Sequence, residues 1–257
     1  MITANVIKTT TRTTLKNKWG EAIFASLQLL SVLFIIVMLG SLVLTVFNGS
    51  KVVVFLLLAV AFLLLSPVFL GTVRWFWALI IEKPLKLSEI YYYFSCYKLF
   101  FKAIMLFIYT IGRMLICAVL SYIPAMVVYV LSKSDILSKF GIEVGDNMLL
   151  THPIITFFVL LGTWLFLNVA SRYSLSFVVM IVKENIDPFN AVSLSRKITK
   201  KRGFALLSIP FSYLGWIALS IFGVTLIYTL PLLICSYVVT ARILITNYCI
   251  DNGLENL

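Results

Sequence analysis

The sequence has few of the side chains on which metal sites and most active sites depend. Its single histidine is His152. Its four cysteines are scattered and form no C-x-x-C pair: Cys96, Cys117, Cys235 and Cys249. A zinc site needs three or four ligands, and a serine-type triad needs a histidine beside its nucleophile. Because glycine-rich phosphate loops are absent as well, we expect no metal, no cofactor and no enzymatic activity.

Acidic residues and long polar segments are also scarce. The chain holds 10 Asp and Glu against 21 Lys and Arg, which gives a net charge of +11. The longest segments between apolar runs are 132–152 and 182–202. Both are well below the roughly 40 residues that a domain needs to fold alone. A separate soluble domain is therefore excluded, and we expect residues 1–257 to form a single membrane-embedded domain.

Long apolar runs dominate the chain instead. Hydrophobic residues make up 61% of it, and the mean hydropathy is +1.06. About 20 apolar residues in a helix cross the hydrocarbon core of a bilayer. The run 203–250 would be about 72 Å long as one helix, so we expect it to turn back near Gly223. The prediction is an all-α, polytopic membrane helix bundle with six spans: about 22–47, 52–73, 103–131, 153–170, 203–222 and 225–249.

The basic residues predict the orientation of the spans. They gather before the first span, between the second and third, and between the fourth and fifth. The opposite side holds only three lysines: Lys51, Lys133 and Lys139. Because cytoplasmic loops retain Lys and Arg, we expect a multi-pass protein of the cell membrane with both termini in the cytoplasm. The positive charge suits anionic membrane lipids, and we expect no nucleic acid partner.

Amphipathic segments lie between the spans. Residues 87–98 place apolar side chains at helical spacing, and a second such pattern follows Asp187 and Pro188, which suit a helix start. Both segments are typical of helices in the membrane interface. Such a helix followed by two spans predicts an internal repeat of two-span units. In each unit the second span would lead back to an arginine, which is Arg74, Arg172 or Arg242.

Arginines within or beside the apolar runs are the candidate binding residues. An arginine at the bilayer centre costs about 2.5–3.5 kcal/mol on insertion scales. One interpretation is that these side chains reach back to the inner interface. The other is a polar pocket in the inner half of the bundle that binds a phosphate or carboxylate, for example a lipid headgroup. Its predicted lining is Arg74, Arg113, Arg172, Arg242 and, as a neutral partner, Asn168.

Several short motifs resemble a bacterial membrane family catalogued as domain of unknown function nine-seven-five. The first is Arg12-x-x-Leu15-Lys16-Asn17-Lys18-Trp19-Gly20. Later motifs follow in the family's order: Ala170-Ser171-Arg172-Tyr173-Ser174, Ala191-Val192-Ser193-Leu194-Ser195-Arg196 and Ser212-Tyr213-Leu214-Gly215-Trp216. The resemblance implies a six-span bacterial protein, mostly of Gram-positive cells. It implies no reaction and no catalytic residues.

These observations leave three functions open. The first is a non-enzymatic integral membrane protein that binds lipid or supports a membrane complex with a protein partner, in envelope homeostasis or peptide resistance. The second is a small permease or transporter accessory subunit that binds an anionic ligand through the inner-half arginines. The third is an intramembrane enzyme acting on lipid, for which the chain has no recognisable nucleophile or metal set.

Overall fold

A computed structural model describes residues 4–47, 50–84, 86–133, 148–200, 204–220, 223 and 225–254. Within these ranges the chain is helical and contains no strand, so the all-α prediction is confirmed. Most of the predicted outer segment 132–152 lies outside the described residues, as do Lys201 and Arg202.

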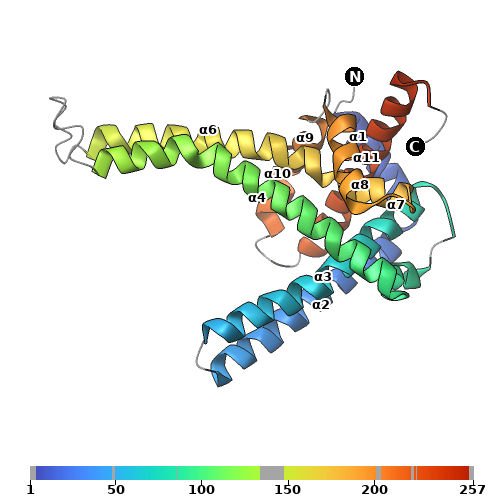
Figure 1. The fold of residues 1–257 in the computed structure, drawn as a ribbon. Helices are drawn as coiled ribbons and strands as arrows, with labels where there is room; N and C mark the ends of the chain where they lie inside the picture. Colours follow the sequence, from blue (N-terminus) through green and yellow to red (C-terminus); the bar gives the residue numbers. More distant parts are fainter. Residues whose placement is uncertain are drawn as a thin grey trace.

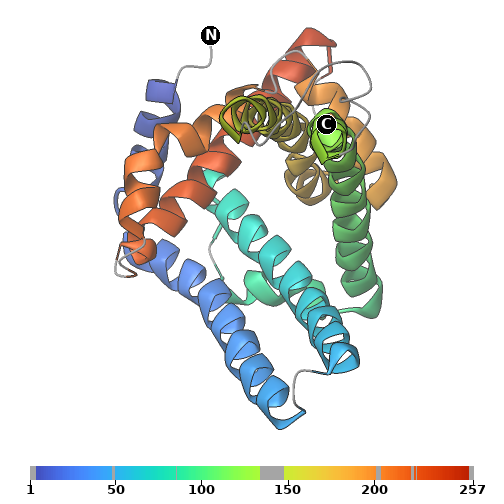
Figure 2. The same ribbon diagram turned by 90° about the vertical axis from the view of Figure 1, so that its left-hand side faces the viewer.

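Two long helical hairpins diverge from one end of the molecule (Figures 1 and 2). One pairs α2 (Trp19–Val46) with α3 (Lys51–Ile80), and the other pairs α4 (Tyr97–Lys133) with α6 (Met148–Ser174). We call the end where they meet the hub. Both termini lie there, opposite the hairpin tips (Figure 1). The hub contains the remaining elements: α1 (Ala4–Leu15), the 3-10 helix η1 (Leu87–Phe94), α7 (Ser176–Val182), α8 (Pro188–Thr199), α9 (Phe204–Ser212), α10 (Leu214–Leu219) and α11 (Leu226–Asp251).

Five stretches of helix are long and apolar enough to cross a membrane. They are Trp19–Val46, Lys51–Ile80, Tyr97–Val130, Ile155–Val182 and Leu226–Asp251. They contain or closely overlap five of the six predicted spans and mostly run further, because the chain stays helical past the apolar run into the hub. In the element order α1 precedes α2 and α3, η1 precedes α4 and α6, and α8 precedes α9, α10 and α11. The internal repeat of two-span units stays a prediction.

The sixth predicted span, 203–222, is not confirmed. Helices α9 and α10 occupy this region and are separated by a turn at Tyr213. The amide of Tyr213 is shared between the carbonyl oxygens of Ile209 and Pro210, at 3.2 Å from each. The backbone of Tyr213, with a φ of −110° and a ψ of 15°, departs from helical geometry. Neither piece is long enough to span a bilayer. The predicted reversal near Gly223 agrees with the structure, because this residue has a φ of +73° between α10 and α11, a conformation that favours glycine.

Burial is concentrated in the hub. Helix α11 packs against α1, α2, α3 and α9, and Trp75 and Phe76 of α3 are fully enclosed nearby. The outer parts of the hairpins expose large apolar side chains, such as Phe55 at 72% and Val119 at 66%. Apolar surface of this extent is unsuited to water. It supports the assignment of the long helices as membrane-spanning.

Hydroxyl groups join α1 to this core. The buried Thr11 Oγ1 lies 3.2 Å from Ser236 Oγ of α11, and Ser236 donates a hydrogen bond of 3.0 Å to the Tyr213 hydroxyl. The ammonium group of Lys8 lies 5.3 Å from the centre of the Tyr213 ring. The hydroxyl groups of Thr11, Ser236 and Tyr213 thus satisfy one another, and they fix α1 beside the turn between α9 and α10.

The predicted amphipathic segments are helical and pack on the hub. In η1 the three-residue turn places Ile90 and Tyr93 on one buried face. Its backbone approaches α3 at Gly71 so closely that a Cβ there would lie 1.8 Å from the Ile90 carbonyl oxygen. Helix α8 begins with Pro188 after the N-cap residue Asp187, as predicted, although the Asp187 side chain makes no capping hydrogen bond.

Candidate functional site

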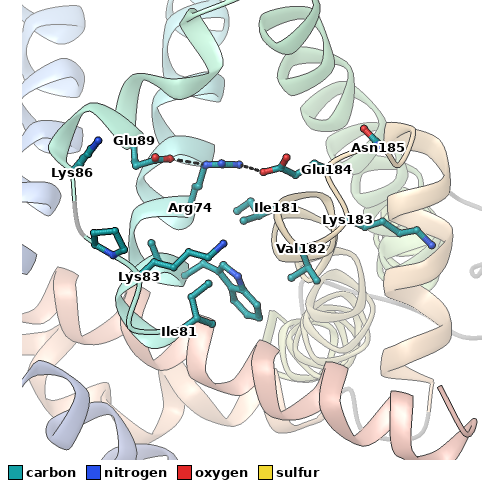
Figure 3. A pocket seen from close by; sticks show the side chains of 13 residues that line it. Arg74, Ile81, Lys83, Lys86, Glu89, Ile181, Val182, Lys183, Glu184 and Asn185 are labelled. Atoms are coloured by element: carbon teal, nitrogen blue, oxygen red, sulfur yellow. Dashed lines mark hydrogen bonds and ion pairs between the residues drawn. The ribbon is translucent and has the colours of Figure 1, made fainter. Parts of the chain in front are cut away.

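Arg74 lies at the centre of a charged cluster between the two hairpins. Its Nε lies 2.8 Å from Glu89 Oε2, and its Nη1 lies 2.8 Å from Glu184 Oε1 (Figure 3). The guanidinium also stacks 3.7 Å from the ring centre of Tyr92. Arg74 thus forms an ion pair with each of the two carboxylates. One arginine therefore joins α3, η1 and the turn after α7.

The local folding of three segments explains this meeting. After α3 the chain reverses at Glu82, which has a φ of +56°, and η1 then returns along α3 so that Glu89 faces Arg74. Glu184 follows the end of α7 at Val182. The ammonium group of Lys102, in α4, donates a hydrogen bond to the Glu184 carbonyl oxygen. This contact holds the Glu184 backbone while its side chain stays 58% exposed.

An open cavity of about 770 Å³ adjoins Arg74. Its walls come from α3, the segment before η1, the end of α7 and the turn that follows. Four cations line it, namely Arg74, Lys83, Lys86 and Lys183, against the two carboxylates of the cluster. In Figure 3 the Lys83 side chain extends across the cavity below Arg74, whereas Lys86 and Lys183 lie at opposite sides and point outward. All three lysines are exposed, and their flexible stems can turn toward a bound anion.

Tyr93 adds no negative charge beside Arg74. Its side chain is buried in η1, and this burial raises the pKa of the Tyr93 phenol well above its ordinary value. The neighbouring Arg74 cation acts in the opposite direction but is the smaller effect. The phenol therefore stays protonated at neutral pH and can serve only as a neutral polar group.

Of the five predicted binding residues, only Arg74 lines this cavity. Arg242 donates a hydrogen bond of 2.8 Å to the Ile80 carbonyl oxygen, and so ties α11 to the end of α3. Arg113 is exposed, and its guanidinium lies 5.7 Å from the ring centre of Phe189 in α8. The alternative interpretation, an arginine that reaches toward the interface, stays a prediction.

Arg172 and Asn168 also lie outside the cavity lining, on helix α6. The Arg172 carbonyl oxygen accepts a hydrogen bond of 2.5 Å from Ser195 of α8. Asn168 donates a hydrogen bond of 2.8 Å to the Trp164 carbonyl oxygen within its own helix. The structure therefore does not bring the arginines together around one cavity.

The residues that do surround Arg74 were missed as site residues. In the sequence, the basic residues predict only the topology and residues 87–98 only an amphipathic helix. No local sequence pattern links Glu89 to Glu184, because they belong to segments far apart along the chain. Among the described residues no group of three or more His, Cys, Asp or Glu is placed to hold a metal ion.

The family comparison agrees with the resemblance seen in the motifs. A family profile described as Protein of unknown function (DUF975) matches residues 1–245. The chain belongs to this family. No curated protein and no solved structure matches it. The profile covers all the elements that build the Arg74 cavity, so the cavity lies within the family's own domain. The family description names no activity, and the function must be argued from the site itself.

Proposed function

We propose that this member of the family is a non-enzymatic integral membrane protein that binds the headgroup of an anionic lipid at the cytoplasmic surface. The observation that carries the proposal is the cavity of about 770 Å³ with four lining cations against two carboxylates. Trp77 lies in the same lining, and tryptophan is enriched where membrane and water meet. A cationic cavity at the boundary between membrane and water would face lipid phosphates.

The surrounding surface supports the same proposal. Helix α8 buries Ala191 and Ile198 against the hub while Arg196 and Lys197 stay exposed. A basic amphipathic helix of this kind attracts anionic headgroups, at about 1 kcal/mol per Lys or Arg near the surface. We therefore expect two kinds of lipid contact, a general one along α8 and a specific one in the cavity.

Lipid retention can separate the two kinds of contact. We expect the triple variant Lys83→Gln, Lys86→Gln, Lys183→Gln to lose most of the anionic lipid that stays bound to the purified protein, because the cavity lining then has no net positive charge. The measurement is native mass spectrometry of the protein released from detergent micelles. The triple variant should lose at least about tenfold in retention, which corresponds to about 1.4 kcal/mol.

A matched control removes the same charge elsewhere. The variant Arg196→Gln, Lys197→Gln, Lys200→Gln also removes three exposed cations from the hub, but none of them lines the cavity. It should lose the lipid held weakly along α8 and retain the anionic lipid of the cavity nearly as the unaltered protein does. Equal losses in the two triple variants would show that only general surface charge binds lipid, and the proposed site would be wrong.

A further inference from the structure

We propose that the cavity selects a phosphate monoester, and that this ligand takes the place of Glu184 on Arg74. The inference rests on the proposed function and specifies its ligand class. A phosphate monoester carries between 1.5 and 2 negative charges near neutral pH, because its second pKa is about 6. Most membrane anions have a phosphodiester headgroup with a single negative charge on the phosphate.

The charge of the cavity matches a dianion. Four cations against two carboxylates leave the lining with a net charge of +2. Glu89 and Glu184 already hold Arg74, so in this state the net positive charge belongs to the three lysines. Among the described residues no ion pair joins these lysines to a carboxylate. A group with two negative charges therefore neutralises the lining, and a group with one does not.

The two carboxylates on Arg74 are not equally replaceable. Glu89 is 33% exposed and belongs to η1, which is fixed on α3 by the close approach at Gly71. Glu184 is 58% exposed and lies in the turn between α7 and α8. Because Lys102 holds its carbonyl oxygen, the Glu184 side chain can turn to solvent without unfolding the segment. Arg74 Nη1 would then face the cavity and bind a phosphate oxygen, as guanidinium groups do.

The Glu184 carboxylate therefore occupies the position on Arg74 that the phosphate would take. It keeps Arg74 paired when the cavity is empty, and it lowers affinity by competing with the phosphate. Glu184→Gln should tighten binding of a phosphate monoester, by roughly tenfold, because it removes both the competitor and a like charge. If the Arg74–Glu184 ion pair were purely structural, Glu184→Gln would disorder the site and weaken binding of the phosphate monoester.

The test is a titration followed by tryptophan fluorescence, since Trp77 lines the cavity. The probes are dioctanoyl phosphatidate, dioctanoyl phosphatidylglycerol and inorganic phosphate, each added to the full chain in detergent at pH 5.5 and pH 7.5. Phosphatidate affinity should rise about fourfold between these pH values, following the second ionisation of the monoester. Phosphatidylglycerol affinity should be lower and should not rise.

The phosphatidylglycerol arm controls for titration of the protein itself. The charged and titratable groups around the site come from α3, η1, α4 and the segments beside them: Arg74, Lys83, Lys86, Glu89, Tyr93, Lys102, Lys183, Glu184 and Asp187. Any change in their ionisation acts on both lipids. Inorganic phosphate that displaces phosphatidate would show that the phosphate group suffices, and phosphate that does not would assign the site to a lipid.

The outcomes separate this inference from the proposed function. If the two lipids bound with equal affinity and equal pH dependence, and the triple lysine variant bound neither, the monoester selectivity would be wrong. The headgroup site itself would stand. Weaker phosphatidate binding in a folded Glu184→Gln protein would overturn the role of Glu184. If the triple lysine variant bound both lipids as tightly as the unaltered protein, the proposed function itself would be wrong.

Discussion

Gly71→Ala should cause the largest loss of stability of any single methyl addition in the described helices. The new Cβ would lie 1.8 Å from the Ile90 carbonyl oxygen and 2.6 Å from its carbonyl carbon. Both atoms are backbone, so no side chain can rotate away and η1 must lift from α3. We expect a loss of about 3 kcal/mol, at the upper end of overpacking costs. Thermal unfolding of the detergent-solubilised protein measures it.

Gly112→Ala provides the matched control. Gly112 lies within α4, and a Cβ there would meet nothing within 4 Å. Because alanine is the better helix former by about 1 kcal/mol, this variant should unfold at the same temperature or higher. If Gly71→Ala unfolded at the same temperature as Gly112→Ala, η1 would not be packed on α3 as described.

Arg74→Gln should have the second largest effect. The Arg74 side chain is 19% exposed, and its guanidinium holds two carboxylates from separate segments. Without it Glu89 and Glu184 lie close together with no cation between them, and the stacking on Tyr92 is lost. We expect a loss of about 2–3 kcal/mol, within the range for breaking hydrogen bonds to charged groups. The midpoint of thermal unfolding, measured in the same detergent, reports this loss.

A second substitution distinguishes a charge effect from a packing effect. Adding Glu89→Gln to Arg74→Gln removes the less exposed of the two unpaired carboxylates. It should restore part of the lost stability, because the cost comes from leaving a charge without its partner. Arg113→Gln is the control, since Arg113 is exposed and lies over Phe189 without an ion pair. If Arg113→Gln destabilised the protein as much as Arg74→Gln, the cluster would have no special role.

Hydropathy predicted most of the architecture because the bilayer imposes a length on each apolar run. The reversal at Gly223 and the start of α8 at Pro188 followed from local backbone preferences, which the sequence expresses directly. The interruption at Tyr213 did not, because residues 203–222 carry no charge, and the Pro210 and Gly215 that flank it are common in unbroken membrane helices as well. Composition alone does not distinguish an unbroken helix from two short ones.

The candidate site was predicted only in part, for a related reason. Arg74 was identified as a charge beside an apolar run. Its partners, Glu89 and Glu184, are 15 and 110 residues away along the chain, and only the packing of the hub brings them together. Whether Arg113 faces a cavity or the interface depends on the rotation of α4 about its axis. That rotation is determined by tertiary contacts, and no local sequence pattern predicts it.

We expect the basic cavity to open on the cytoplasmic side and the hairpin tips to lie outside. Two exposed positions test it most directly: Asn185 in the cavity lining and Ser50 between α2 and α3. Each is changed to cysteine after the four native cysteines are replaced by alanine, and intact cells are treated with a membrane-impermeant maleimide. We predict that Ser50→Cys is labelled in intact cells and that Asn185→Cys is labelled only after permeabilisation. Labelling of Asn185→Cys in intact cells would contradict the account.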